Sequence, residues 1–130
     1  MQFDKDMNSN QAELFLEVRD FIILQIEKQG LHVKEKFSEN ITSYFSEEYQ
    51  SGFCYLITKD DYVHIGWFRG AKFYDKIDLL FGKGKTIRGQ KVTILDEIQK
   101  EAISFYIKQT EILLIENDEI QKTKQLLKGK

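Results

Sequence analysis

The hydrophobic pattern of this chain changes its period twice along its 130 residues. Between residues 31 and 68 apolar and polar side chains alternate, in stretches such as LHVKEKF and YVHIGWF, which is typical of β-strands. Before and after that region apolar residues recur every three or four positions, the period of an amphipathic helix. Short connections between the alternating stretches favour an antiparallel meander over a parallel sheet. The sequence therefore predicts an α+β fold, with N- and C-terminal helices packed on one face of an antiparallel sheet of about five strands.

The N-terminal helix has recognisable ends. Asn10 and Glu13 have the spacing of a capping box, and Gly30 offers the left-handed residue that ends many helices. The apolar stripe between these ends consists of Ala12, Phe15, Val18, Ile22 and Ile26.

A second long helix is expected near the C-terminus. Asp96 and Gln99 mark its start. Its shared face is expected to consist of Ile98, Ala102, Phe105, Tyr106, Gln109 and Ile112. The tail, from about residue 115 to 130, either continues this helix or forms another one after Asn117.

The middle of the chain contains a predicted hairpin, in which 53–58 and 62–68 pair across the acidic turn KDD. The segment DKIDLLF is expected to make one or two helical turns, and IRGQKVTIL is expected to form the last strand. Helical spacing and strand parity together predict one core that contains Phe15, Ile22, Cys54, Leu56, Ile65, Phe105 and Ile112.

Composition limits the class of protein. A chain of this length fits a single domain, so we expect residues 1–130 to form one, with an additional helical tail at about 115–130. The net charge of −2 gives no long-range attraction to nucleic acids or anionic membranes, so neither is an expected partner, although a local basic patch is compatible with it. One cysteine, no signal-peptide pattern and no long apolar segment predict a cytoplasmic protein.

A glycine-rich basic cluster is the main candidate site. Arginine side chains and exposed backbone amides suit phosphate or carboxylate groups, and glycine lets the backbone approach a ligand. The tentative anion-binding residues are Arg69, Gly70, Lys83, Gly84, Lys85 and Arg88. This cluster predicts a non-enzymatic binding module for a small anionic ligand or an acidic protein partner. The alternative left open for the cluster is a solvated loop without a ligand. A second copy of the chain, in a homodimer, is a further candidate partner.

Other chemistry has little support in the sequence. Gly84, Lys85 and Thr86 resemble the end of a phosphate-binding loop, but Leu79 stands where that motif needs glycine. No nucleophile elbow or zinc-ligand spacing is present, so no catalytic residue and no cofactor is predicted. The aromatic residues at the end of the second hairpin strand are expected to belong to the core rather than to a ligand site; they are Trp67, Phe68, Phe73 and Tyr74.

The central region resembles the YdhG-like family of bacterial domains of unknown function. The resemblance is carried by an FCYL-type strand, by the strand end GWFRGA, and by Leu79, Leu80, Gly82, Gly84 and Lys85, which match an LL-x-G-x-G-K signature. It covers roughly residues 10 to 114, and it departs from the family at Thr42, where members often carry proline. The resemblance implies a fold similar to frataxin. It also implies an alternative function in iron binding or iron delivery, with the acidic helix residues Glu13, Glu17 and Asp20 as ligands, because hard oxygen donors suit iron.

Overall fold

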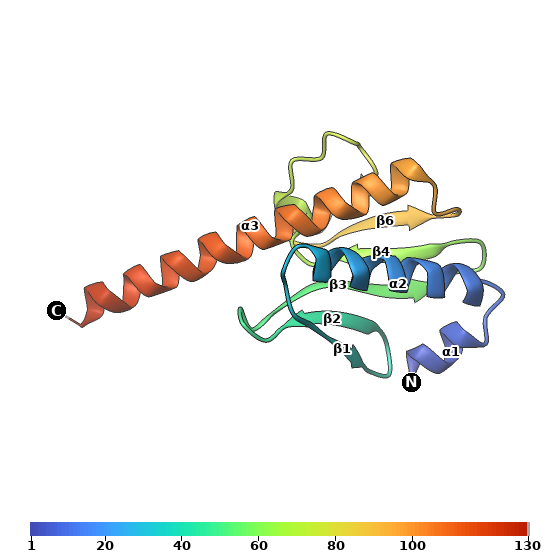
Figure 1. Cartoon of the computed structure of the whole chain (residues 1–130), viewed down its shortest axis with the longest axis horizontal. Helices are drawn as coiled ribbons and strands as arrows, with labels where there is room; N and C mark the ends of the chain where they lie inside the picture. The colour runs from blue at the N-terminus through green and yellow to red at the C-terminus, as the bar shows by residue number, and fades with distance from the viewer. Residues whose placement is uncertain (130) are drawn as a thin grey trace.

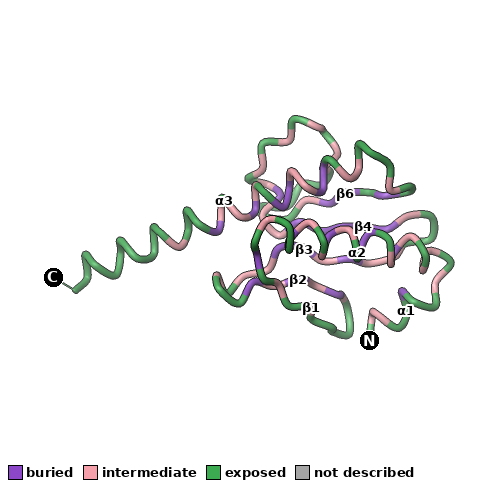
Figure 2. The backbone as a smooth tube through the Cα atoms, viewed as in Figure 1, coloured by how far each residue is buried: buried purple, intermediate pink, exposed green. Residues whose placement is uncertain are grey.

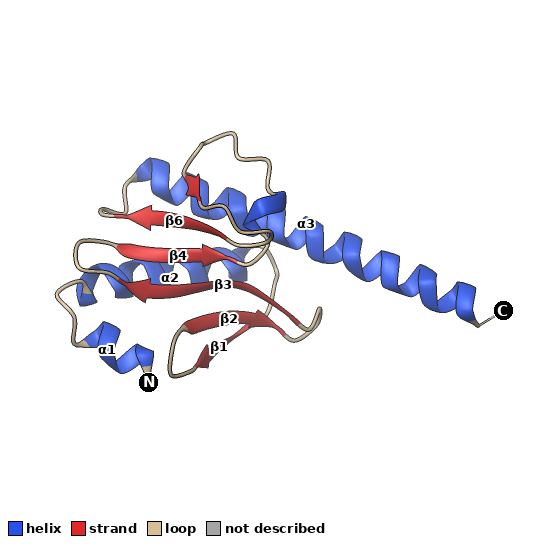
Figure 3. Ribbon diagram, turned by 180° about the vertical axis from the view of Figure 1, so that it is seen from behind, coloured by secondary structure: helices blue, strands red, loops and turns tan. Residues whose placement is uncertain are grey.

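The computed structural model describes residues 1–129 and has an α+β fold. Helices α2 and α3 cover one face of an antiparallel sheet, and the opposite face is seen in Figure 3. Figure 1 shows the elements, which in chain order are α1 (Gln2–Met7), α2 (Ala12–Lys28), β1 (Val33–Phe37), β2 (Thr42–Ser46), β3 (Ser51–Thr58), β4 (Val63–Trp67), the 3-10 helix η1 (Gly70–Lys72), β5 (Leu80–Phe81), β6 (Arg88–Val92) and α3 (Glu97–Lys128).

The sheet within residues 1–129 has six strands in the order β1-β2-β3-β4-β6-β5, and every neighbouring pair is antiparallel. The predicted hairpin is confirmed, since Leu56 of β3 pairs with Ile65 of β4. The predicted last strand is confirmed as β6. The expectation of about five strands was one too low, because β5 is only two residues long.

The segment DKIDLLF does not form the helical turns that its sequence predicts. The carboxylate of Asp75 instead accepts hydrogen bonds from the backbone N–H groups of Asp78, at 2.9 Å, and Leu80, at 3.0 Å. It also accepts one from the hydroxyl of Tyr106 on α3. Asp78 has a positive φ of 62°, which ends any helical path. These contacts hold the chain in a turn before β5, and Leu80 then pairs with Gln90 of β6.

The hydrophobic core lies between the sheet and the two long helices. Five of the seven predicted core residues are fully buried there, namely Phe15, Ile22, Cys54, Leu56 and Ile65. The prediction was wrong for Ile112, which is 45% exposed, and Phe105 is only partly buried. The helix is turned relative to the expected stripe, so that its buried residues are Ala102, Ile103, Tyr106, Ile107, Thr110 and Leu114.

The N-terminal end differs from the sequence expectation. Asn10 does not cap α2, because the N-cap position belongs to Gln11 and no side chain caps it. A short helix, α1, precedes it. The buried side chain of Asp6 on α1 accepts hydrogen bonds from the backbone N–H of Thr58, at 3.0 Å, and from its hydroxyl, at 2.7 Å. This carboxylate therefore attaches α1 to the end of β3.

Other helix ends agree with the sequence. Gly30 has a positive φ of 77° just after α2, which glycine adopts without strain. At the start of α3, the carboxylate of Asp96 accepts a hydrogen bond of 3.0 Å from the backbone N–H of Gln99. Both ends were predicted from the residue types alone.

Helix α3 is one uninterrupted helix that extends far beyond the sheet (Figure 1). The tail therefore continues the helix instead of forming a separate one after Asn117. Figure 2 shows the projecting part as exposed over most of its length. Among the described residues, no helix combines the length and apolar character that a bilayer crossing requires.

Candidate functional site

A cleft of about 440 Å³ lies where the chain leaves β4 and passes beneath the middle of α3. Its polar side chains are Arg69, Lys72, Thr86, Glu116 and Asn117. Its apolar side chains are Phe68, Leu113 and Ile120. One wall therefore comes from the segment after β4 and from the loop before β6, and the other wall is α3.

The end of β4 and the glycine-rich loop meet beside this cleft, as the sequence analysis expected. The backbone N–H of Ala71 donates a 3.0 Å hydrogen bond to the carbonyl of Thr86. A Cβ atom at Gly70 would lie 2.6 Å from the Cβ atom of Arg88 and 2.9 Å from its backbone nitrogen. Only glycine permits this approach, so Gly70 allows η1 to pack against the start of β6.

Arg69 is the main cationic group of the cleft. Its side chain is half-buried, and its guanidinium donates a 3.3 Å hydrogen bond to the carbonyl of Gly52. Within residues 1–129 it forms no ion pair with a carboxylate. Burial lowers the pKa of Arg69, because it disfavours the charged form. Arg69 is thus a partly desolvated cation that has no ion-pair partner among residues 1–129.

The remaining predicted site residues lie outside the cleft. The guanidinium of Arg88 donates to the carbonyls of Gly84 and, at 2.9 Å, Ile87, so this side chain closes the loop on itself. Lys83 and Lys85 are exposed on the loop and do not line the cleft. Of the predicted site residues, the structure thus places Arg69 in the lining of the cleft; Gly70 is its neighbour in the chain and packs against Arg88, and the two lysines are exposed to solvent.

Two features of the cleft were not anticipated from the sequence. Lys72, which is not among the predicted anion-binding residues, adds a second cation. Glu116 contributes a carboxylate from α3, so two cations and one anion line the cleft. A residue pair separated by this much sequence carries no local signal, because only the folding of the chain brings α3 opposite the segment after β4.

The alternative iron ligands do not form an assembled site. Glu13, Glu17 and Asp20 are exposed on α2, and Asp20 forms an ion pair of 3.1 Å with Arg19. Across the part of the chain that the structure describes, no group of three or more His, Cys, Asp or Glu side chains is placed to hold a metal ion. Cys54 is buried, and burial raises the pKa of its thiol, which makes it a core residue rather than a nucleophile.

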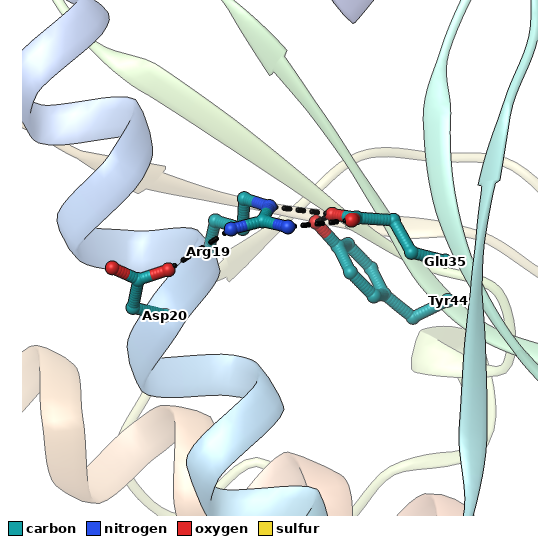
Figure 4. A network of polar contacts seen from close by, with 4 residues as sticks. All are labelled: Arg19, Asp20, Glu35 and Tyr44. Atoms are coloured by element: carbon teal, nitrogen blue, oxygen red, sulfur yellow. Dashed lines mark hydrogen bonds and ion pairs between the residues drawn. The ribbon is translucent and has the colours of Figure 1, made fainter.

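A polar network that sequence reasoning missed joins α2 to the first two strands (Figure 4). The guanidinium of Arg19 donates two hydrogen bonds of 2.6 Å to the carboxylate of Glu35 on β1. The hydroxyl of Tyr44 on β2 donates to the same carboxylate at 2.9 Å. Burial raises the pKa of Tyr44, and the nearby Glu35 charge adds to the effect. The network is enclosed by its own partners, so we assign it to stability.

Comparison with known proteins gives no relative for this chain. A scan against models of protein families finds no match, and neither the curated proteins nor the solved structures that were searched contain a similar one. The class that the observations define is therefore an α+β protein whose antiparallel sheet carries flanking helices, with a charged cleft at one end of the sheet.

Proposed function

We propose that this protein is a small non-enzymatic binding module that accepts the anionic group of a small molecule or of an acidic partner in the cleft beside Arg69. The observation that carries the proposal is the state of Arg69, a half-buried cation without a carboxylate partner among residues 1–129. A buried charge is costly unless it is paired, so an anion that enters the cleft gains more there than it would at an exposed lysine.

The other side chains of the cleft narrow the chemistry of the ligand. Phe68, Leu113 and Ile120 offer apolar surface next to Arg69. Glu116 would repel a ligand that carries only negative charge, so the favoured ligand has one phosphate or carboxylate, an apolar part and a hydrogen-bond donor. The hydroxyl of Thr86 and the amide of Asn117 add groups that both donate and accept.

We further propose that the chain is a distant, cytoplasmic member of the YdhG-like group. Support comes from the way the motif residues lie in the fold. Arg69 and Gly70 of the strand end FRGA lie beside the cleft, and Gly70 packs against Arg88 just after the loop that contains GKGK. A motif whose parts meet at one place is more specific than the same residues scattered over the surface.

The test is to compare binding and folding in the same variants. A thermal-shift screen of inorganic phosphate, pyrophosphate and small phosphorylated or carboxylated metabolites would first select a ligand, since native-state binding raises the unfolding midpoint. Calorimetry with the selected ligand should then show at least about tenfold weaker binding by Arg69→Ala, with partial recovery in Arg69→Lys.

Lys83→Ala is the matched control, because Lys83 is a cation on the neighbouring loop that does not line the cleft. It should leave the affinity unchanged. The proposal fails if Arg69→Ala loses stability but keeps the affinity, since Arg69 would then serve only its hydrogen bond to Gly52. It also fails if no compound of the screen binds in a way that depends on Arg69.

A further inference from the structure

The face of the sheet that carries no α-helix within residues 1–129 has a distinctive composition (Figure 3). Strand pairing identifies its residues, because directly paired residues lie on the same face. Tyr55 pairs with Gly66, which pairs with Gly89, which pairs with Phe81. In the next row Ile57 pairs with His64, which pairs with Lys91. We call this surface the open face; it also includes Lys34, Lys36, Ser43 and Phe45 of β1 and β2.

Four rings form a continuous row along the open face. The ring centroids of Phe68 and Tyr55 are 5.5 Å apart, those of Tyr55 and His64 are 5.6 Å apart, and those of His64 and Phe81 are 5.7 Å apart. The row therefore crosses the sheet from β3 to the edge strand β5. Phe81 is 47% exposed, and the other three rings are partly exposed.

Glycine residues let these rings lie against the backbone. A Cβ atom at Gly66 would lie 2.0 Å from a ring carbon of Tyr55. At Gly89 it would lie 2.5 Å from the ring of His64 and 2.7 Å from that of Phe81. The rings therefore occupy the space that a side chain at the glycine position would fill. They lie close to the backbone of the neighbouring strand, so the surface is flatter there and its ring area extends over several strands.

The charges of the open face are one-sided. Lys34, Lys36 and Lys91 point to it, and no acidic residue occupies an open-face position on the strands described in residues 1–129. Lys36 lies with its Nζ atom 3.6 Å from the ring centroid of Phe45, and Lys34 forms an ion pair of 3.6 Å with Glu47 from the following turn. Two more exposed lysines, Lys83 and Lys85, lie two and four positions after Phe81 in the chain. The overall charge of −2 thus conceals a local cationic and aromatic surface.

We propose that the open face binds single-stranded nucleic acid, with bases stacked on Tyr55, His64 and Phe81 and phosphates held by the surrounding lysines. Aromatic rings on a β-sheet accept unstacked bases of any sequence, and lysines supply the attraction to the backbone. A duplex is a poorer fit, because its bases are already stacked and the face presents no element that would enter a groove. This site is distinct from the cleft proposed above, and Phe68 contributes to both.

The experiment measures fluorescence anisotropy of labelled ten-nucleotide oligo(dT) and oligo(rU) with the whole chain, beside a duplex of the same length. Both single strands should bind more tightly than the duplex, and the comparison of DNA with RNA tells which one is preferred. Phe81→Ala should weaken binding about tenfold, because it removes one stacking surface. Lys91→Ala should reduce the slope of log affinity against log salt by about 0.7, because one phosphate contact is lost.

Matched controls lie elsewhere on the molecule. Tyr74 is an aromatic residue that is 73% exposed outside the sheet, and Lys5 is an exposed lysine on α1. Neither Tyr74→Ala nor Lys5→Ala should change the affinity. Phe81 lies on a two-residue edge strand, so its removal should leave the fold intact; a circular dichroism melt checks this, and Lys91→Glu gives a second variant without loss of apolar surface.

Four outcomes overturn the proposal. The first is that the duplex binds as tightly as the single strands, which would indicate charge attraction without stacking. The second is that Phe81→Ala and Tyr74→Ala behave alike. The third is that Arg69→Ala abolishes oligonucleotide binding while the open-face variants retain it, which would place the nucleic acid in the cleft. The fourth is that a poly-glutamate peptide displaces the oligonucleotide as well as unlabelled oligonucleotide does, and equally well from Phe81→Ala. This would point to an acidic protein partner instead.

Discussion

The two faces of the sheet are built from alternate residues of the same strands, yet they differ in nearly every property. The covered face carries large apolar side chains that are fully buried beneath α2 and α3, including Tyr44, Leu56, Ile65 and Trp67. The open face carries partly exposed rings, lysines and glycines. Because side chains alternate with a period of two, a strand can serve stability with one set of residues and binding with the other.

Polar groups show the same contrast. On the covered face, Gln90 is buried and satisfied, since it accepts a 3.0 Å hydrogen bond from the indole of Trp67 and donates one of 2.7 Å to Gln99. On the open face, Tyr55 and His64 contact each other at 3.3 Å and retain access to solvent. Burial requires polar groups to be paired within the fold, whereas exposure leaves them available to a ligand.

The largest expected effect separates two neighbouring residues of β3. Leu56 is fully buried on the covered face, and Ile57 is partly exposed on the open face. Leu56→Ala should reduce the free energy of unfolding by about 2–5 kcal/mol, because it removes apolar contacts and leaves a cavity. Ile57→Ala should cost about 1 kcal/mol or less. Urea unfolding of both variants measures the difference, and equal losses would contradict the assignment of the two faces.

The next effect concerns two ion pairs of β1, which point to opposite faces. Glu35 lies on the covered side, where Arg19 and Tyr44 hold it with three hydrogen bonds. Glu35→Ala should cost about 1.5–3 kcal/mol, because hydrogen bonds to a charged group are lost and the partly buried Arg19 and the buried Tyr44 lose their acceptor.

Lys34 on the open face pairs with Glu47, and both side chains are exposed. Glu47→Ala serves as the control and should change stability little, because exposed ion pairs contribute little. Denaturant unfolding of both variants provides the measurement. If Glu47→Ala loses as much unfolding free energy as Glu35→Ala, burial on the covered side does not make the Glu35 pair the stronger one.

A smaller effect tests the glycines beneath the aromatic row. Gly66→Ala should cost about 1–3 kcal/mol, because the new methyl group overlaps the ring of Tyr55 and forces it to move. At Gly84, the nearest atom would lie 3.7 Å from an added Cβ atom, so Gly84→Ala should be close to neutral. Thermal unfolding of the two variants checks the prediction. A neutral Gly66→Ala would mean that the ring does not lie over that glycine.

Sequence patterns predicted the parts of the fold that depend on local spacing. Strand parity placed Cys54 and Leu56 on one face. The cap at Asp96 was predictable because its carboxylate accepts a hydrogen bond from the backbone N–H only three residues later in the chain. The predicted stripe of α3 was right for Ala102 and Tyr106 and wrong for Ile112, because residues three and four apart fit two adjacent faces of a helix. Packing against the sheet selected the face with Ile107 and Leu114 instead of the one with Ile112.

The candidate sites were less predictable because they depend on contacts between distant segments. Composition identified Arg69, but the opposite wall of the cleft comes from α3, some forty or more positions later in the chain. The aromatic residues near the end of β4 were expected to be core, which is confirmed for Trp67 and wrong for the exposed Tyr74. The open face was missed because its rings belong to three strands and one connecting segment that only the register brings together.

The smallest expected effect is the pH dependence that His64 confers on stability. Burial on the open face lowers the pKa of His64 below its usual 6.5, and the nearby charge of Lys59 adds to the effect. The unfolded chain therefore takes up a proton at this residue at higher pH than the folded protein does. Stability from the neutral side chain is fully present above pH 6.5 and is lost as the pH falls through the lowered pKa of the folded protein.

Urea unfolding at pH 7.5 and 5.5 should show a smaller loss of unfolding free energy between the two pH values in His64→Gln than in the unaltered protein. His32→Gln removes an exposed histidine before β1 and should leave the loss unchanged, whereas an equal loss in all three proteins would mean that His64 is as accessible to protons in the fold as in the unfolded chain.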